Sequence, residues 1–108
     1  MKKKKPPRFR ALLESLIADG IYEIEVEYHG PELLVCVVRG SLGFGVASYR
    51  SEEDKRAADA IIADLRKKKS IMVGDKIYRL TFTEQENFHE PSWRIRIRES
   101  KQGSLRKK

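Results

Sequence analysis

Apolar side chains first recur along the chain at the spacing of an α-helix. Five of them follow the i, i+3, i+4, i+7, i+8 rule and form one stripe: Phe9, Leu12, Leu13, Leu16 and Ile17. Pro7 suits the first turn of such a helix, and Gly20 suits its end, because glycine readily adopts the backbone conformation that follows many helices. The pattern therefore predicts a helix before position 20 with one buried face.

The spacing then changes to that of strands. From Ile21 to Tyr28, Tyr22 and every second residue after it are apolar and the residues between them are glutamates, which predicts a half-buried strand. The next run, Leu33–Arg39, is apolar at every position but the last, so we expect a central strand covered on both faces. Turns at 29–32 and 40–43 separate these runs and lead to a third strand at about Phe44–Tyr49.

A capping pair, an apolar stripe and a basic last turn together predict a second helix. Ser51 and Asp54 form a capping pair at its start. Its apolar stripe consists of Ala58, Ile61, Ile62 and Leu65. Basic residues from Arg66 to Lys69 close its last turn, where positive charge suits the helix dipole, so we interpret that run as structural.

The remaining chain predicts a connection, two strands and a loop. Ser70–Asp75 is expected to be a connection that turns Ile71 or Val73 inward. A strand at Lys76–Thr83, a loop at Glu84–Ser92 and a last strand at Trp93–Glu99 follow. In the last strand Trp93, Ile95 and Ile97 alternate with arginines, so we expect the apolar set to face the helices.

These elements predict an α+β fold with the order α-β-β-β-α-β-β. We expect two layers, a largely antiparallel sheet of about five strands with two helices on one face. The expected domain covers residues 8–99, and residues 1–7 and 100–108 are expected to be disordered basic tails. The outer face of Leu33–Arg39 must then be covered by the last hairpin, a partner or a second copy, or remain an apolar patch.

The net charge of +7 is concentrated at the two ends of the chain. Residues 1–10 carry six basic side chains and no acidic one, and residues 94–108 carry seven against one glutamate. The segment between them is mildly acidic, so a nucleic-acid interpretation depends on the tails and the last strand. The N-terminal candidates for phosphate contacts are Lys3, Lys4, Lys5, Arg8 and Arg10. The alternative is that the basic ends are solubilising.

The strongest candidate site is a row of arginines in the last strand. Arg94, Arg96 and Arg98 stand at period two, which places them about 6–7 Å apart on one strand face, similar to the spacing of successive phosphates. Arginine also grips phosphate through two parallel hydrogen bonds. Arg79 on the preceding strand is a candidate fourth member. The alternative is that a row of glutamates on the first strand pairs with these arginines, and these are Glu23, Glu25 and Glu27.

One stretch resembles part of the RNA-recognition motif. Over positions 42–49, its RNP1 pattern is matched by Gly43, Phe44, Gly45 and Tyr49. Leu42 is not basic and Val46 is not aromatic, and no strand with the second aromatic signature precedes the first helix. The resemblance therefore implies at most that Phe44 stacks on a base. Because only one stacking ring is present, we expect Phe44 to act mainly in packing.

The element order also resembles that of the double-stranded-RNA-binding domain. That fold presents basic residues to phosphates at the start of its second helix. Here that place is acidic, with Glu52, Glu53 and Asp54, which would repel phosphates. We therefore transfer no binding residues from that family.

The sequence contains no recognisable catalytic, metal or cofactor motif. Its two histidines, His29 and His89, lie in a turn and a loop, and Cys36 lies in an apolar run that predicts burial. The acidic loop at 84–90 lacks the spacing of a metal-binding loop, and no glycine-rich phosphate loop is present. We therefore expect a protein that is not an enzyme and uses neither a metal ion nor a cofactor.

Two functions remain open on the sequence. The first is a small nucleic-acid-binding protein whose basic tails and arginine-lined last strand contact the phosphates of RNA or DNA. The second is a protein-binding regulator or inhibitor that acts through its acidic strand or its apolar sheet face. A single cysteine, no signal sequence and no apolar run of membrane-spanning length favour a cytoplasmic protein that does not bind a membrane.

Overall fold

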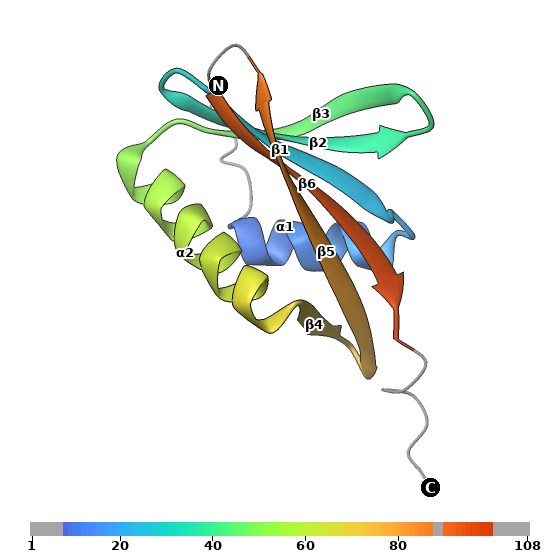
Figure 1. The fold of residues 1–108 in the computed structure, drawn as a ribbon. Helices are drawn as coiled ribbons and strands as arrows, with labels where there is room; N and C mark the ends of the chain where they lie inside the picture. Colours follow the sequence, from blue (N-terminus) through green and yellow to red (C-terminus); the bar gives the residue numbers. More distant parts are fainter. Residues whose placement is uncertain (1–7, 88–89, 101–108) are drawn as a thin grey trace, which may run out of the picture.

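The computed structural model describes residues 8–87 and 90–100, and this part of the chain contains two helices and six strands (Figure 1). Every strand pairs antiparallel with its neighbours. The elements are α1 (Phe9–Ala18), β1 (Glu23–His29), β2 (Glu32–Arg39), β3 (Leu42–Tyr49), α2 (Glu52–Lys68), β4 (Ser70–Val73), β5 (Lys76–Asn87) and β6 (Glu90–Glu99). The expected α+β class with a largely antiparallel sheet is confirmed.

The sheet consists of two meanders that meet in its centre. Its strand order is β3-β2-β1-β6-β5-β4, so β1–β3 form one half and β4–β6 the other. Helix α2 carries the chain from one edge of the sheet to the opposite edge (Figure 1). Strand β6 then returns to pair with β1, where Ile24 lies opposite Ile95. The first and last strands are therefore neighbours, as the pairing of their charged rows requires.

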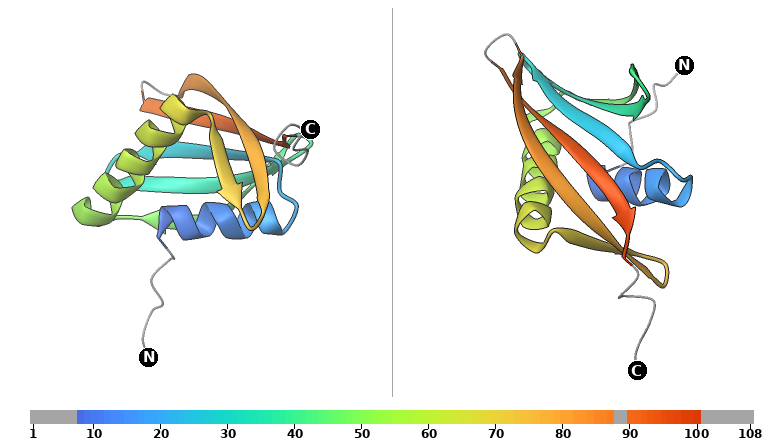
Figure 2. Two further views of the ribbon diagram at one scale, coloured as in Figure 1. Left: turned by 90° about the horizontal axis from the view of Figure 1, so that it is seen from below. Right: turned by 45° about the vertical axis from the view of Figure 1, so that its right-hand side comes forward.

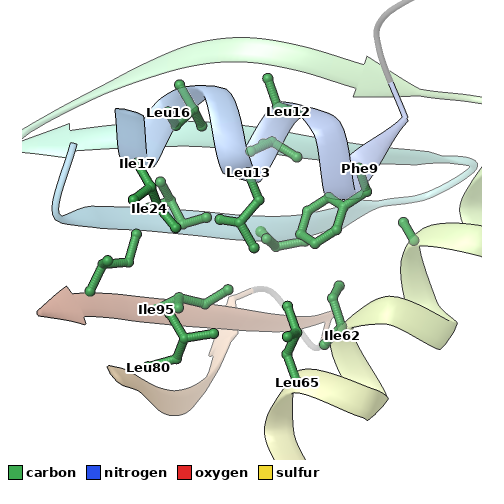
Figure 3. Packing of buried hydrophobic residues seen from close by; sticks show 14 of the residues in the cluster. Phe9, Leu12, Leu13, Leu16, Ile17, Ile24, Ile62, Leu65, Leu80 and Ile95 are labelled. Carbon is green, nitrogen blue, oxygen red and sulfur yellow. The ribbon is translucent and has the colours of Figure 1, made fainter. Parts of the chain in front are cut away.

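Both helices cover the same face of the sheet and leave the other face open (Figures 1 and 2). The whole predicted stripe of α1 is buried. It packs with Ala58, Ile62 and Leu65 of α2 against the sheet, where Ile24 and Ile95 are fully buried (Figure 3). As expected, Ile95 and Ile97 are buried beneath the helices and Trp93 packs against the same core. One hydrophobic core therefore fills the space between the two layers.

Local backbone chemistry explains where the helices begin and end. The hydroxyl oxygen of Ser51 accepts a hydrogen bond from the amide of Asp54 at 3.0 Å, as its capping pattern predicts. At the other end Lys69 has φ 61°, and its amide donates to the carbonyl of Leu65. Gly20, with φ 88°, ends α1 as predicted. The basic last turn of α2 is thus placed directly before β4.

The sheet has one strand more than the sequence predicts. The segment expected to be a connection forms β4 from Ser70 to Val73 and pairs with the first residues of β5. Ile71 points inward and is buried, as expected. Four residues are too few to show a clear alternation, so a short edge strand of this kind resembles a connection in sequence.

The last hairpin is also longer than predicted. The segment expected as a loop from Glu84 to Ser92 instead extends both strands, because β5 runs to Asn87 and β6 begins at Glu90. Its polar composition favoured a loop, but backbone pairing between two strands needs no apolar side chains. Ser92 is only 2% exposed, and its hydroxyl donates to the carbonyl of Gln85 at 3.3 Å.

Smaller differences concern the first three strands. Strand β1 begins at Glu23 rather than Ile21, and β3 begins at Leu42 rather than Phe44. Strand β2 lies next to the edge strand β3, and neither helix covers its outer face, where Leu34 and Cys36 are half-buried. The expectation that this strand is covered on both faces is therefore wrong. Its unbroken apolar run reflects one buried face and one partly exposed face.

Candidate nucleic-acid interface

The open face of the sheet carries the charged rows that the sequence predicts. In the register between β1 and β6, Glu25 lies opposite Arg94 and Glu23 lies opposite Arg96. On the other side of β6, Arg98 lies opposite Arg79 of β5. The face therefore begins with alternating charges near β1 and becomes purely basic toward the end of β6.

Arg94 is held by the glutamates of β1. Its Nε donates to Oε2 of Glu25 at 3.0 Å, a second nitrogen contacts the same oxygen, and Nη1 lies 3.2 Å from Oε2 of Glu23. The hydrogen bond that Arg94 donates to Glu25, followed by the charges of Glu25 and Glu23, raises the pKa of the Arg94 guanidinium above its ordinary value. Arg94 therefore serves in cross-strand pairing, the alternative that the sequence left open.

The third glutamate of the row has a different partner. Glu27 lies opposite Ser92, so no arginine stands across from it. Its Oε1 instead lies 2.8 Å from Nε2 of His29, and this contact raises the pKa of the exposed imidazole. Among the described residues, the three glutamates therefore form ion pairs with only one of the three arginines, because Glu23 and Glu25 both contact Arg94.

The other arginines on this face have no acidic partner within the part of the chain that the structure describes. Arg79, Arg96 and Arg98 are exposed, and none of them forms an ion pair with any residue in the described ranges 8–87 and 90–100. Arg79 and Arg98 face each other across the strands, an arrangement of like charges that costs stability when no anion lies between them. This end of the sheet is therefore a concentrated positive site.

These arginines surround a recess of about 570 Å³, which we name the arginine hollow. Its lining consists of Tyr22, Glu23, Arg79, Thr81, Arg96, Ile97 and Arg98. Glu23 contributes the only carboxylate among these lining residues, and it already contacts Arg94. A volume in this range is typical of pockets that hold small molecules, about 300–1,000 Å³.

Tyr22 is the member of the arginine hollow that sequence reasoning missed. Tyr22, Ile24 and Val26 stand at every second position, which predicts that Tyr22 is buried with the other two, yet it is 62% exposed. It precedes β1, and its carbonyl accepts a hydrogen bond from the amide of Ile97 at 2.8 Å, which fixes its backbone beside β6. The sequence signal for its exposure was the apolar Ile21 directly before it, because adjacent residues of an extended chain point to opposite sides and Ile21 is the one that is buried.

A second recess lies where the end of α2 meets β5. This α2–β5 cleft has a volume of about 820 Å³, and its charged lining residues are the basic Arg66, Lys68, Lys69 and Arg79 and one carboxylate, Glu84. Arg66 lies over the ring of Trp93 at 4.1 Å from the centroid, and Phe82 contacts the same ring edge-on. The basic end of α2 therefore lines a recess in addition to suiting the helix dipole. Arg79 lines both recesses.

The remaining candidate residues lie elsewhere. Lys3, Lys4 and Lys5 are outside the described residues. Arg8 and Arg10 lie at the start of α1 in the helix layer, and Arg10 pairs with Glu14 at 3.2 Å. The structure therefore does not bring these two arginines to the row on β6.

Phe44 is separated from the arginines by position and by face. It lies on the edge strand β3, with β2 and β1 between it and β6. It pairs with Val37, whose side chain faces the helices, so its ring projects on the opposite face from the arginine row. The ring is 50% exposed, because an edge strand extends beyond the cover that the helices provide. The exposed ring contradicts the expectation that Phe44 acts mainly in packing. Its role as a base-stacking ring stays a prediction, and the structure does not bring it to the arginine row.

This exposure sets the expected effect of Phe44→Ala. Fully burying a phenylalanine contributes about 1.5–3 kcal/mol, so we expect the loss of a half-exposed ring to lower the free energy of unfolding by about 1 kcal/mol. Urea unfolding followed by circular dichroism measures it. A loss of more than about 3 kcal/mol would instead indicate a ring within the core.

Arg94→Gln tests the cross-strand pairing. The change leaves Glu23 and Glu25 without their partner, and we expect the free energy of unfolding to fall by about 0.5–2 kcal/mol at low salt. The matched variant Arg98→Gln should be neutral or stabilising, because it removes a like charge opposite Arg79. Urea midpoints of the two variants compare them. Equal destabilisation by both would contradict the division between paired and unpaired arginines.

Thiol chemistry and metal binding have little support among the described residues. Burial raises the pKa of the Cys36 thiol, which keeps it protonated and weakly nucleophilic near neutral pH. Among the described residues, no group of histidine, cysteine, aspartate and glutamate side chains could hold a metal ion. His89 lies outside the described residues. No helix in the part of the chain that the structure describes is long and apolar enough to cross a membrane.

Comparisons of this chain with protein families, with curated proteins and with solved structures find no match. The described surface is therefore the only indication of function. Its most distinctive feature is a group of exposed arginines without acidic partners, beside an exposed ring.

Proposed function

We propose that this protein binds nucleic acid without catalysing a reaction and that it holds phosphates on the open face of its sheet. The observation that carries the proposal is the group Arg79, Arg96 and Arg98, which is exposed and has no ion-pair partner among the described residues. Arginine is the side chain best suited to grip phosphate through two hydrogen bonds.

The geometry of the group supports phosphate as its ligand. Arg96 and Arg98 are two residues apart on one strand, and Arg79 lies directly opposite Arg98. Guanidinium groups this close repel one another, and a phosphate between them converts the repulsion into attraction. Three adjacent cations suit a ligand with several phosphates better than a single anion. A polynucleotide supplies such a series.

The basic tails extend the proposed site. The amide of Ser100 donates to the carbonyl of Ile77 at 2.8 Å, so the chain is still held against β5 where the C-terminal basic segment begins. We propose that this segment and the N-terminal lysines add phosphate contacts of low sequence specificity. A cytoplasmic location is part of the proposal, since a single cysteine fits a reducing compartment.

The experiment that tests the proposal is a salt titration of binding by the full chain. We expect labelled RNA or DNA to bind at about 50 mM salt and the logarithm of the affinity to fall linearly with the logarithm of the salt concentration. Each phosphate contact adds about 0.7–0.9 to the slope, so a slope of at least about 3 is expected from the three arginines and the tails. Fluorescence anisotropy measures it. No binding of either nucleic acid at this salt concentration would refute the proposal.

A second candidate function, a protein-binding module, is favoured by the edge strand β3. Leu42, Phe44 and Val46 are exposed there, and the segment from Gly40 to Tyr49 contains no charged residue. Edge strands usually carry charges or proline that prevent pairing with another chain. The acidic strand β1 is a weaker candidate for binding a protein partner, because its glutamates already contact Arg94 and His29.

Replacing Val46 with lysine distinguishes the two functions. A charge on β3 should abolish binding to a protein partner that pairs with this edge and should leave nucleic-acid affinity within about twofold, because the arginines lie on the far side of β1. Size-exclusion chromatography with light scattering measures self-association, and anisotropy measures nucleic-acid binding. Loss of nucleic-acid binding in this variant would place the site on β3 instead.

A further inference from the structure

We infer that the bound nucleic acid is single-stranded and runs from the arginine hollow over Arg79 into the α2–β5 cleft. The inference rests on the proposed function and deepens it. The arginine row alone does not select between single and double strands, because both present phosphates. The selection comes from what lies around the row: an exposed ring, two recesses and the residue that joins them.

The position of Tyr22 favours a single strand over a duplex. Its ring is largely exposed and lines the same hollow as Arg96 and Arg98. A ring beside guanidinium groups allows a base to stack while the attached phosphate binds an arginine. The bases of a single strand can turn out to reach such a ring. In a duplex the faces of the bases are covered by neighbouring bases, so Tyr22 would gain no base contact.

The connection between the two recesses also favours a flexible single strand. Arg79 lines both the arginine hollow and the α2–β5 cleft, so a phosphate bound there lies between them. A chain that enters both must bend within the width of a few strands. A single strand bends easily, whereas a duplex is stiff over about 150 base pairs.

The chemistry of the α2–β5 cleft suits both the phosphates and the bases of a single strand. Lys68 and Lys69 supply positive charge there, and the guanidinium of Arg66 lies over the ring of Trp93. Bases of single strands stack on aromatic rings and on guanidinium planes. Lys68 lies 3.2 Å from Asp64 on the exposed surface of α2, and such a pair is weak enough to yield to a phosphate. The cleft therefore repeats the combination of cations and a stacking surface found in the arginine hollow.

The first experiment compares single-stranded with duplex nucleic acid and tests the ring of Tyr22. Anisotropy with the full chain at low salt measures affinity for single strands of uridine or thymidine, about twelve nucleotides long, and for a hairpin duplex of similar length. We expect the single strands to bind at least about tenfold more tightly. Tyr22→Leu should weaken single-strand binding by about five- to 150-fold and leave duplex binding unchanged, and Tyr22→Phe should retain it. The matched control is Phe44→Leu, an exposed ring on the other face, which should change neither.

The second experiment tests the path. The variant Lys68→Gln/Lys69→Gln should bind a strand of about four nucleotides as the unchanged chain does, because that length fills only the arginine hollow. It should bind a strand of about twelve nucleotides at least about fivefold more weakly, with a salt slope lower by about 1.4. The matched control removes the same charge from other parts of the surface, with Arg50→Gln/Arg56→Gln. It should affect both lengths by less than about twofold.

The outcomes separate the inference from the proposed function. If no nucleic acid binds at low salt, both are wrong. If the duplex binds as tightly as the single strand and Tyr22→Leu changes neither, the proposed function stands and the inference is overturned. If the lysine variant weakens both lengths equally, or neither, the path into the α2–β5 cleft is overturned.

Discussion

Changing Arg79, Arg96 and Arg98 together to glutamine is expected to reduce nucleic-acid affinity at low salt by at least about 100-fold. A contribution of only about 1 kcal/mol from each arginine gives this factor, at about 1.4 kcal/mol per tenfold. The salt slope for a single strand should fall by about 2, which corresponds to three lost phosphate contacts at about 0.7 each. The fold should remain intact, because all three side chains are exposed and none has an ion pair among the residues described. Anisotropy and urea unfolding measure the two properties.

The control for this variant removes three positive charges from other parts of the surface, through glutamine at Arg39, Arg50 and Arg56. All three side chains are exposed. If affinity depends only on net charge, the two triple variants should behave alike. We expect the control to lose less than about fivefold, because charges far from bound phosphates act only through the screened long-range field. Equal losses would show that the arginine hollow is not the binding site.

Ile95→Ala is expected to cause the largest loss of stability among single substitutions in the central sheet. The side chain is fully buried in β6, directly opposite the equally buried Ile24 of β1. Truncating a buried isoleucine to alanine costs about 2–5 kcal/mol, which is a large part of the about 5–15 kcal/mol that stabilises a small domain. The thermal midpoint should fall by at least about 8 °C. Differential scanning calorimetry measures this change.

Two further variants define what the Ile95 result means. Met72→Ala removes an exposed side chain from the edge strand β4 and should change stability by less than about 0.5 kcal/mol. Ile24→Ala combined with Ile95→Ala should destabilise by an amount different from the sum of the two single changes, because neighbours share one cavity. Additive effects would indicate that the two residues do not touch and would contradict the pairing of β1 with β6.

The sequence predicts the helices and the long strands well because their signals are local. Ser51 caps α2, and the apolar spacing from Phe9 to Ile17 identifies α1. The short strand β4 and the polar extension of the last hairpin escape prediction because their stability comes from pairing with β5 and β6. Their partners lie only three to nine residues away across tight turns, but residues 70–73 are too few and residues 84–87 too polar to show the apolar alternation that marks a strand.

The candidate site is predictable only in part, because the register between strands decides which charged side chains meet. Alternation alone identifies Arg96 and Arg98 as outward-facing residues. Which arginine is neutralised depends on strand register, and the register places Arg94 between two glutamates while Arg98 meets Arg79. Phe44 belongs to the stretch that resembles a binding motif, but its ring projects on the face opposite the arginine row. Tyr22 is a residue of the arginine hollow only because β6 returns beside the start of β1.

The central position of β6 also determines what the chain exposes while it is being synthesised. Ile24 and Ile95 stand 71 positions apart in the chain, so β1 is made long before the strand that completes its other side. Translation at about 5–20 residues per second leaves that edge of β1 unpaired for about 4–14 s. During this interval α1 and β1–β3 hold half of a hydrophobic core with no second half to cover it. The nascent chain therefore exposes apolar surface and an open strand edge for seconds, which makes it a substrate for chaperones and a source of aggregation when synthesis outpaces them.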